Sequence, residues 1–385
     1  MADETILAGG IVEKIGEDQA ILTHQWNDDT LRENTRVEDH VQAIEWIRDL
    51  LLDSKHGGVE KSNEIAAVGH RVVHGGEHFF HAAKITADCE RAIEEVSTLA
   101  PLHNFSNLLG IRAAQECFAE ATHVAVFDTA FHQTMPETAF LYPIPYRLYK
   151  QDHIRKYGFH GTSHRFVSQR AAELLGKKTD AFTGITCHLG NGCSLAAIRN
   201  GQSVDTSMGL TPLEGVAMGT RSGDIDPAII NHLAIQKGLS IEEIDHLLNR
   251  ESGLLGISEI SNDVRDIQKA AQTGNSQARQ ALEVFAYRVR KYIGSYLAVL
   301  APLDAIVFTG GIGENAHEIR QNVLEDLESL GILISESRNR DCKGREAEIS
   351  EENSPIKLWV IPTNEELLIA RDSRDLLLSE SAVQD

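Results

Sequence analysis

The chain has few cysteines, and their spacing fits none of the usual structural uses. The five residues Cys89, Cys117, Cys187, Cys193 and Cys342 are odd in number and form no Cys-x-x-Cys pair. This pattern argues against a disulfide framework or a zinc site and is typical of free thiols in a reducing compartment. Cys187 is expected to be a small core residue and not a nucleophile.

Positive charge and long apolar runs are also scarce. The chain has 36 lysines and arginines against 57 aspartates and glutamates, a formal net charge of −21. Nucleic acid is therefore not an expected partner, because its binding needs a basic face. No apolar run has the length of a membrane span, and the first residues carry no basic, apolar leader. The sequence predicts a cytoplasmic protein without membrane contact, which must attract any anionic substrate with local Arg and Lys.

Two rounds of strands followed by helices run along the 385 residues. Periodicity predicts strands at 6–12, 19–23, 65–73 and 124–127, with helices at 38–52, 89–99 and 107–117. A second set has strands at 183–187, 195–199, 305–308 and 357–361, with helices at 163–175, 227–236, 241–249, 276–300 and 364–378. Residues 131–150, rich in Tyr and Pro, are expected to be an irregular passage between domains. The order predicts two α/β domains with mixed sheets and a cleft between them.

A glycine turn late in the chain predicts a ligand site. The strand at 305–308 runs into Thr309-Gly310-Gly311-Ile312-Gly313-Glu314-Asn315, and a polar helix is expected from about Ala316. Glycines at a strand-to-helix turn let the backbone approach a ligand, and the helix N-terminus favours an anion. A nucleoside triphosphate fits this pattern. So does a dinucleotide, because Gly311 to Ala316 matches G-x-G-x-x-A and Glu336 is a candidate for ribose binding.

Two strand ends carry a charged side chain. Arg71 stands in the segment His-Arg-Val-Val-His-Gly-Gly at 70–76. Its planar and permanently charged guanidinium suits a carboxylate or a phosphate, and the glycines imply a close backbone approach. Asp128 follows the strand at 124–127, and its carboxylate is placed to hold Mg²⁺ or orient a nucleophile. The structural alternatives are a surface ion pair for Arg71 and a helix N-cap for Asp128.

A histidine and a second glycine turn follow. His160 lies between Gly158 and Gly161. Thr162 or Ser163 is expected to cap the next helix, which would leave His160 as the functional group. The turn His188-Leu189-Gly190-Asn191-Gly192 comes after a strand and offers N–H groups to a phosphate. No Gly-Lys-Ser or Gly-Lys-Thr follows it, which excludes a P-loop enzyme.

The densest polar cluster is the segment 218–227. Arg221 stands between Gly219 and Gly223, a setting that suits charge developing on a phosphoryl group. Asp226 and Pro227 are expected to start a helix, with the Asp as N-cap and the Pro in the first turn. Asp224 fits either a functional or a structural use.

Taken together, these segments resemble the acetate kinase family over nearly the whole chain. The resemblance rests on His-Arg-Val-Val-His-Gly-Gly (70–76), Ala-Pro-Leu-His-Asn (100–104), Val-Phe-Asp-Thr-Ala-Phe-His (126–132), Gly-Phe-His-Gly-Thr-Ser-His (158–164), His-Leu-Gly-Asn-Gly (188–192), Asp-Thr-Ser-Met-Gly-Leu-Thr-Pro-Leu-Glu-Gly (205–215), Gly-Thr-Arg-Ser-Gly-Asp-Ile-Asp-Pro (219–227), Phe-Thr-Gly-Gly-Ile-Gly-Glu-Asn (308–315) and Pro-Thr-Asn-Glu-Glu-Leu (362–367). So many long motifs in the family's order are highly specific. The resemblance favours ATP over a dinucleotide.

The resemblance implies a two-domain, actin-like ATPase fold with ribonuclease H-like domains and a central cleft. Residues 1–130 with 366–385 would form an incomplete N-terminal-type domain, and 131–365 a C-terminal nucleotide-binding domain. The implied reaction is the reversible, Mg²⁺-dependent transfer of the γ-phosphoryl group of ATP to acetate, with Mn²⁺ as a substitute metal. Partners implied in the same way are a second copy of the chain and a metabolic link to phosphate acetyltransferase.

Site residues carry over motif by motif. The resemblance gives Asp128, His160, Arg221 and Arg71 catalytic roles, with Arg71 and Arg221 on the acetate carboxylate and the phosphoryl group. Glu365 would be the magnesium residue. The pocket for the acetate methyl would be lined by Val73, Leu102, Phe159 and Pro212. ATP would be held by His188, Leu189, Gly190, Asn191, Gly192, Asp263, Val264, Arg265, Gly311, Ile312, Gly313, Glu314 and Asn315.

The chain departs from the family at its beginning. The family opens with a strand, an Asn-x-Gly-Ser-Ser-Ser turn and a second strand with a lysine, and this chain has neither. Because those strands occupy the middle of the first sheet, unpaired strand edges are expected, and each buried unsatisfied group costs ~1–3 kcal/mol. We expect a start codon placed too late and a longer native protein. A real truncation with little or no activity is the alternative.

Three other functions compete with acetate kinase. Propionate kinase is the near alternative, although Val73 favours the smaller acid. A non-catalytic nucleotide-binding chain would keep the adenosine loop without the first phosphate loop. An NAD-linked dehydrogenase would use Gly311 to Ala316, although its fingerprint normally opens a βαβ unit and here stands late and alone.

Overall fold

The computed structural model describes residues 4–98 and 104–384, and contacts divide the chain into two compact units. The first unit comprises Met1–Ala130 and Glu366–Asp385, and the second comprises Phe131–Glu365. Within the described residues, no helix is long and apolar enough to cross a membrane.

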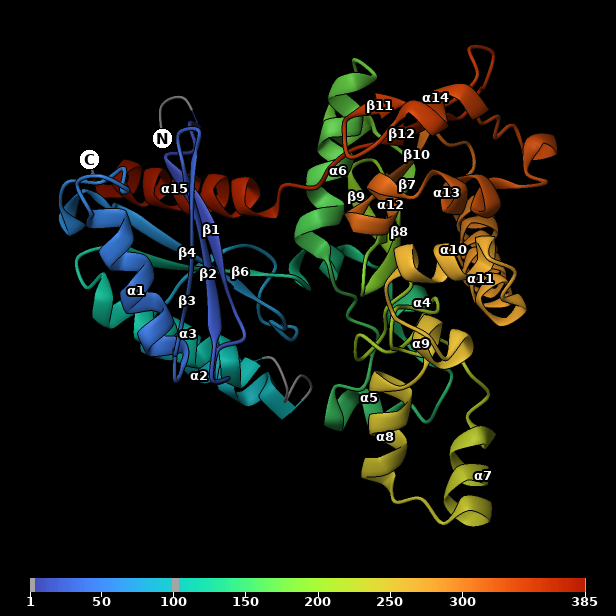
Figure 1. The fold of residues 1–385 in the computed structure, drawn as a ribbon, viewed down its shortest axis with the longest axis horizontal. Coiled ribbons are helices and arrows are strands. Elements are labelled where there is room, and N and C mark those ends of the chain that lie inside the picture. The colour runs from blue at the N-terminus through green and yellow to red at the C-terminus, as the bar shows by residue number, and fades with distance from the viewer. Residues whose placement is uncertain (1–3, 99–103, 385) are drawn as a thin grey trace. The chain divides into compact units, whose positions relative to one another are not determined.

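The first unit contains two three-stranded sheets and the helices that cover them (Figure 1). One sheet is antiparallel and has the strand order β1-β2-β3, while the other is mixed with the order β4-β6-β5. The strands are β1 (Ala8–Glu13), β2 (Ala20–Trp26), β3 (Asp29–Thr35), β4 (Ala67–Val72), β5 (Ala83–Lys84) and β6 (Thr122–Phe127). The helices are α1 (His40–Leu52), η1 (Ser62–Glu64), α2 (Ala87–Glu95), η2 (Val96–Thr98), α3 (Asn104–Cys117) and α15 (Glu365–Gln384), the last beginning at the boundary between the units.

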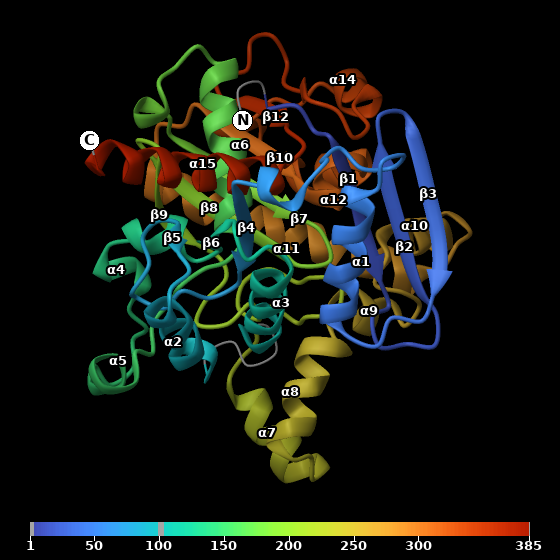
Figure 2. The same ribbon diagram turned by 90° about the vertical axis from the view of Figure 1, so that its left-hand side faces the viewer.

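Apolar side chains from both helices and strands form the core of this unit. Val72, Ile93, Ile111 and Phe127 belong to one buried cluster, which joins β4 and β6 to α2 and α3. Burying a side chain such as Phe127 contributes about 1.5–3 kcal/mol, so this cluster anchors both strand ends. A smaller cluster packs α1 on β2, a layer visible in Figure 2.

Four strands of the first unit, β1, β3, β4 and β5, pair on one side only. β4 pairs with β6, and β1 pairs with β2, so each ends its sheet. Beside β4 lies an apolar groove of about 680 Å³, lined in part by Ile65, Ala67, Ile369 and Leu377.

The second unit is built on one six-stranded sheet with the order β11-β12-β10-β7-β8-β9. β10 lies near the middle and runs parallel to both β7 and β12, whereas β7, β8 and β9 are antiparallel. The strands are β7 (Gly184–Leu189), β8 (Cys193–Arg199), β9 (Gln202–Thr206), β10 (Ala305–Thr309), β11 (Ala347–Glu348) and β12 (Lys357–Val360). Because β7, β8 and β10 are buried on both faces, their sequences are nearly continuous apolar runs.

Helices surround this sheet and also extend beyond it (Figure 1). The longest, α11 (Ser276–Leu300), packs on β8 and on α9, α10 and α13. The others are η3 (Ala130–Thr134), α4 (Glu137–Phe140), α5 (Arg147–Asp152), α6 (Gly161–Leu174), η4 (Thr179–Ala181), α7 (Ala228–Lys237), α8 (Ile241–Arg250), α9 (Gly253–Ser258), α10 (Val264–Gln272), α12 (Gly310–Asn315), α13 (His317–Leu324), η5 (Glu328–Leu330) and α14 (Glu336–Asp341).

Several elements differ from the sequence prediction. Residues 131–150 contain η3, α4 and α5 and are not simply irregular. β3 and β9 were not expected, and β3 shows why: it is exposed along nearly its whole length and has no apolar alternation. The helix expected from about Ala316 is confirmed as α13, whose N-cap is Ala316, but the short helix α12 that precedes it from Gly310 was not expected.

Candidate active site

The parallel pair β4 and β6 places two charged residues of the first unit side by side. Arg71 lies opposite Val126, and Asp128 directly follows β6, where its N–H donates to the carbonyl of Val72. The Arg71 guanidinium hydrogen-bonds and ion-pairs with the Asp128 carboxylate. Asp128 is only 1% exposed, whereas the Arg71 side chain is 42% exposed. Arg71 therefore neutralises a buried carboxylate, while nearly half of its own side chain stays exposed.

The loop after β4 is fixed by side chains from two other segments. The N–H of Val73 donates to the Asn107 side chain at 3.1 Å, and the N–H of His74 donates to Asn104 at 3.1 Å. Burial lowers the pKa of His74 to about 4, so the ring is neutral at pH 7. The glycines of this loop serve its own packing: a Cβ at Gly75 would lie 2.9 Å from the ring of Phe127, and Gly76 has a φ of +60°.

His160 stands at the start of α6 in the second unit. It is the N-cap residue, with left-handed backbone angles (φ 56°, ψ 25°), and makes no side-chain capping bond. The prediction that Thr162 or Ser163 caps this helix is wrong, because both lie inside its first turn. Ser163 instead hydrogen-bonds His188 at 2.8 Å. The rings of His160 and His188 stack, with their centroids 4.3 Å apart.

Arg221 and His160 point to the same spot on the backbone, at Gly192. A Cβ built on Gly192 would lie 3.4 Å from Nη1 of Arg221 and 3.4 Å from Nε2 of His160. Burial lowers the pKa of Arg221, and the nearby charge of Arg250 lowers it further. A guanidinium nevertheless stays charged at neutral pH. The backbone at Gly192, which carries no side chain, is therefore flanked by the guanidinium cation of Arg221 and the imidazole of His160.

The loop of Arg221 is held by backbone contacts. Its carbonyl accepts from the N–H of Met218 at 3.0 Å, and the carbonyl of Met218 accepts from the N–H of Leu254 at 2.8 Å. Asp224 is fully used in this framework: it accepts from the Gly215 N–H and from the Tyr292 hydroxyl. Of the two uses open to Asp224, the structure thus shows the structural one. Asp226 accepts from the Ala228 N–H at the start of α7, but the N-cap residue is Pro227, so the predicted cap is wrong by one residue.

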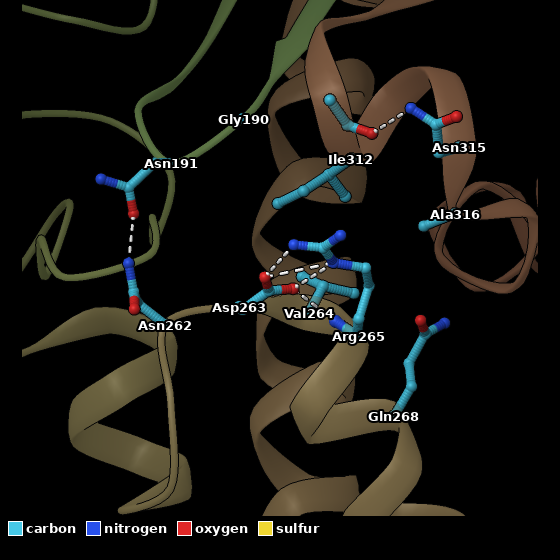
Figure 3. A pocket seen from close by; sticks show the side chains of 11 residues that line it. Gly190, Asn191, Asn262, Asp263, Val264, Arg265, Gln268, Ile312, Asn315 and Ala316 are labelled. Atoms are coloured by element: carbon cyan, nitrogen blue, oxygen red, sulfur yellow. Dashed lines mark hydrogen bonds and ion pairs between the residues drawn. The ribbon is translucent and has the colours of Figure 1, made fainter. Parts of the chain in front are cut away.

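A pocket of about 710 Å³ opens beside the two glycine turns of the second unit (Figure 3). It combines backbone from both turns with side chains of α10 and α12. Its lining residues are Gly190, Asn191, Asn262, Asp263, Val264, Arg265, Gln268, Gly311, Ile312, Asn315 and Ala316. The size falls within the range of ligand pockets. Eight of the predicted ATP residues meet here, namely Gly190, Asn191, Asp263, Val264, Arg265, Gly311, Ile312 and Asn315.

Polar contacts shape the walls of this pocket. Asn262 donates to the Asn191 side chain at 2.9 Å, and Asn315 donates to the Gly311 carbonyl at 2.9 Å. Arg265 folds back on Asp263 in an ion pair that Figure 3 shows below Ile312. Asp263 also accepts from the Arg265 N–H and so caps α10. The sequence analysis did not predict this helix or single out Asn262 and Gln268, although an Asp before an apolar i, i+3 pair is a helix-start signal.

The remaining predicted ATP residues lie outside the pocket lining: His188, Leu189, Gly192, Gly313 and Glu314. Glu314 has a structural task at the strand ends. Its carboxylate accepts from the Gly310 N–H at 2.9 Å and from the Thr363 N–H at 3.3 Å. Gly310 is required at its position, since φ is +76° and a Cβ would lie 2.8 Å from the Leu189 carbonyl oxygen. Glu336, the ribose candidate, pairs with Arg340 on α14 and does not line the pocket.

The four residues predicted to hold the acetate methyl are distributed over the chain. Val73 is buried in the first unit, and Phe159 is buried in the second. Pro212 is half-buried in the second unit. Leu102 lies outside the described residues. Cys187, on β7, is fully buried and its pKa is raised by burial, as expected for a core residue.

No cluster of three or more His, Cys, Asp or Glu side chains suited to a metal ion occurs within residues 4–98 and 104–384. Glu365, the predicted magnesium residue, is half-buried at the first position of α15.

A nucleotide-dependent phosphotransferase requires a pocket of nucleotide size beside a glycine turn. It also requires cationic or hydrogen-bonding side chains close to that turn, as Arg221 and His160 are here. Fold and site define this class. The sequence model described as the Acetokinase family matches residues 1–371. The chain belongs to this family, whose members are kinases with a carboxyl group as acceptor and ATP as co-substrate. The family decides against the dehydrogenase interpretation of Gly311 to Ala316.

Curated proteins and solved structures agree with the family. The acetate kinase of Geobacillus kaustophilus (strain HTA426) is 54% identical over 372 residues, 97% of this chain and 93% of that protein. The acetate kinase of Halothermothrix orenii is 52% identical over 380 residues, 98% and 95% of the two chains. The crystal structure of Porphyromonas gingivalis acetate kinase matches with a TM-score of 0.92 at 43% identity, covering 97% and 94%. A propionate kinase from Francisella tularensis matches with 0.91 at 43% identity and the same coverage. These matches confirm the actin-like ATPase fold expected from the resemblance.

Proposed function

We propose that this protein transfers the γ-phosphoryl group of ATP to the carboxylate of acetate, reversibly, giving acetyl phosphate and ADP. The observation that carries the proposal is the convergence of Arg221 Nη1 and His160 Nε2 on Gly192. This spot belongs to the same glycine turn as Gly190 and Asn191, which line the nucleotide-sized pocket. A phosphoryl group reaching out of that pocket past the turn would meet both side chains.

The proposed mechanism is mostly alignment and charge neutralisation. A carboxylate is already a nucleophile, so the step requires no strong base. Arg221 and His160 would donate to the equatorial oxygens of the transferring group, where charge develops. In the first unit, the partly exposed guanidinium of Arg71 would bind the acceptor carboxylate, and Asp128 would fix that guanidinium through their ion pair. Val73, Leu102, Phe159 and Pro212 would contact the methyl group.

We further propose that the second unit, 131–365, is the nucleotide-binding domain, with 1–130 and 366–385 as the other domain. The adenosine would lie against Ile312, Val264 and the backbone of Gly311. The phosphates would lie along the turn from His188 to Gly192, whose N–H groups face an anion in a glycine-rich bend. Arg265 would have to leave or share Asp263 to bind the nucleotide, because the two are paired in the structure.

Mg²⁺ is expected to enter with ATP. It is usually bound through one or two carboxylates together with the substrate phosphates, and seldom by an all-protein cage. The residues present fit this use: no three-carboxylate cluster occurs in the described parts of the chain, and Glu365 and Asp128 are single carboxylates. We propose Glu365 as the residue that holds the ion, with Asp128 acting near it. When bound, Mg²⁺ supplies neutralisation of charge on the phosphate oxygens, and Mn²⁺ would replace it.

We also propose that the protein is a homodimer in the cytoplasm. Acetyl phosphate would be the intermediate that it shares with a phosphate acetyltransferase. The surface of α7 supports the dimer: none of its ten residues is buried, and Ile229 and Ile235 are exposed. Both isoleucines would lose contact with water if a second copy of the chain covered this helix. Light scattering of the purified chain measures its mass, and a monomer at micromolar concentration would contradict this proposal.

The test of function is a hydroxamate assay for acetyl phosphate with acetate, ATP and Mg²⁺. Arg221→Ala is expected to lower kcat by roughly 10²–10³-fold or more, as for loss of one donor to a transition-state oxyanion. Arg279→Ala, an exposed arginine on α11, is the matched control and should leave kcat unchanged. Equal activity of Arg221→Ala and the parent chain would contradict the proposed site.

The same assay with propionate tests the second candidate function. The Francisella propionate kinase is as similar in fold as the acetate kinases, so this substrate has to be measured. One extra methylene changes binding by only ~1–3 kcal/mol, so both acids should react, acetate better. A higher kcat/KM for propionate would make this chain a propionate kinase with the same mechanism.

A further inference from the structure

Four polar side chains of the second unit are joined in a row by three hydrogen bonds. Thr186 Oγ1 lies 2.7 Å from Nδ1 of His164. His164 Nε2 lies 2.8 Å from Oγ of Ser194. Ser194 Oγ in turn lies 2.8 Å from Nδ1 of His160. The row therefore runs from β7 through α6 and β8 to the histidine at the start of α6.

Three of the four side chains are fully buried. Thr186, His164 and Ser194 are all 0% exposed. Burial also lowers the pKa of His164 well below its ordinary value, so this ring is neutral and carries a single N–H. With one proton on each hydroxyl and one on His164, the hydrogen bonds of the row must all run in the same direction.

Only one of the two directions uses every buried donor. If the row runs toward Thr186, His160 donates to Ser194, Ser194 to His164, and His164 to Thr186. The Thr186 hydroxyl is then left without an acceptor, because among the described residues its one hydrogen-bond partner is His164. If the row runs toward His160, Thr186 donates to His164, His164 Nε2–H to Ser194, and Ser194 to Nδ1 of His160. An unused buried donor is costly, so this second direction is favoured.

We propose that Thr186, His164 and Ser194 are positioning residues that keep the proton of neutral His160 on Nε2. Nδ1 of His160 is the acceptor at the end of the row, and a neutral imidazole has only one proton. Nε2 is the nitrogen that faces Gly192 and Arg221. His160 thereby presents an N–H donor to a phosphoryl oxygen without having to be a cation. This inference rests on the proposed function only for the identity of that oxygen.

The charged and titratable groups around His160 agree with a neutral donor. The His188 ring stacks on it from β7, and Arg221 faces the same spot from its own loop. His132 lies edge-on to His164 at 5.6 Å. Its pKa is lowered to about 4, mainly by burial, so it is neutral as well. Arg221 is the permanent cation of this group and opposes a second positive charge on His160.

The first experiment reads the tautomer and needs no activity. The holoprotein is labelled with ¹⁵N-histidine, and the two ring nitrogens of His160 are followed by long-range ¹H–¹⁵N correlation. The signals that disappear in His160→Gln assign them among the 17 histidines. The parent chain is expected to show a protonated Nε2, and Ser194→Ala a mixture of both tautomers. An Nδ1 proton in the parent chain, or unchanged signals in Ser194→Ala, would overturn the proposal.

The second experiment uses a matched pair at the far end of the row. Thr186→Val keeps the shape of the side chain and removes the hydroxyl, whereas Thr186→Ser keeps the hydroxyl. In the acetyl phosphate assay, Ser194→Ala should lower kcat roughly 10-fold or more with KM nearly unchanged, as when the partner that fixes a histidine tautomer is lost. Thr186→Val should cause a smaller loss and Thr186→Ser none. Equal kcat in Thr186→Val and Thr186→Ser would contradict a role for the row beyond Ser194.

The two experiments separate the possible failures. A tautomer that shifts in Ser194→Ala while the parent chain makes no acetyl phosphate would support the row and contradict the proposed function. Acetyl phosphate formation with an unchanged tautomer in Ser194→Ala would leave the function standing and overturn the row. A loss of kcat in Ser194→Ala without any tautomer change would show a packing role only, which also overturns the proposal.

Discussion

At the scale of single residues, the site depends on the absence of a side chain at Gly192. The sequence predicted that this turn offers N–H groups to a phosphate. The structure adds a second reason for the glycine, because Arg221 and His160 both approach to 3.4 Å of the place where a Cβ would stand. A methyl group there would occupy the spot assigned above to the transferring phosphoryl group.

Replacing this glycine tests the assignment. Gly192→Ala is expected to lower kcat/KM for ATP by about 10-fold or more, as when a close contact displaces reacting groups by about 1 Å. The stability of the chain should change little, since 3.4 Å is an ordinary contact distance. Steady-state kinetics and a melting scan measure the two effects. Gly294→Ala on α11 is the control, because its Cβ would meet nothing within 4 Å and activity should stay at the parent level.

At this scale the sequence predicted candidate reactive groups but not the residues that support them. Arg71, Asp128, His160 and Arg221 were each singled out because a charged or titratable side chain stood beside glycines or at a strand end. Ser194 gave no such signal: it contacts His160 across 34 residues and looks like any buried strand serine. His164 had one, since it follows His160 by four residues at the start of a helix and such residues share a face.

At the scale of elements, α12 forms one wall of the proposed nucleotide pocket, and the buried Arg320 on α13 holds the end of that helix. Arg320 is 0% exposed and has no carboxylate partner in the described residues. It donates instead to carbonyls of Gly313, Glu314 and Cys342 and to Asn339. The last carbonyls of a helix have no donor within the helix. Arg320 donates hydrogen bonds to two of them, those of Gly313 and Glu314.

Removing this arginine should weaken both the fold and the pocket. Arg320→Met keeps much of the volume but leaves several buried carbonyls unsatisfied, which is expected to cost at least about 3 kcal/mol. Because Ile312, Asn315 and Ala316 lie on or next to α12, ATP affinity should fall as well. Urea unfolding and an ATP titration measure the two effects.

Arg340→Met on the neighbouring helix α14 is the matched control. Arg340 is exposed and pairs only with the exposed Glu336, a contact worth no more than about 1 kcal/mol. If Arg320→Met were as stable as Arg340→Met, the clamp on α12 would have no energetic weight, and the pocket wall would have to be held by other contacts.

Two of the elements that the sequence did not predict, β3 and α12, lack the patterns on which prediction depends. β3 is exposed on both faces, so the apolar alternation on which strand prediction depends is absent. α12 has three glycines among its six residues, a composition with poor helix propensity, and forms because tertiary contacts such as the Glu314 and Arg320 hydrogen bonds hold it. The long strands and helices with a buried face were found within a few residues of their observed ends.

At the scale of the whole molecule, acidic charge outside contrasts with neutral histidines inside. The formal charge is −21 with the histidines neutral. His74 and His132 are fully buried, and burial lowers the pKa of each to about 4. His70 is half-buried and has a pKa of about 4 from burial and the neighbouring His123. These groups take up protons more readily in the unfolded chain than in the folded one.

The stability of the protein should therefore fall with pH in the mildly acidic range. A histidine with a pKa of 6.5 unfolded and about 4 folded contributes its full stabilisation above pH 6.5. That contribution is lost as the pH falls from 6.5 to 4 and changes little below pH 4. For His132, the difference of about 2.5 pH units corresponds to about 3 kcal/mol, as an order of magnitude.

Urea midpoints between pH 7.5 and 4.5 at constant ionic strength measure this dependence. His132→Gln removes the titrating ring, so its midpoint should be lower at pH 7.5 but fall less steeply with acid than that of the parent chain. His246→Gln is the control, because that ring is 64% exposed on α8 and its loss should leave the slope unchanged. If the urea midpoints of His132→Gln and of the parent chain fell in parallel, the acid sensitivity would come from other groups. The remaining buried histidines would then be replaced one at a time.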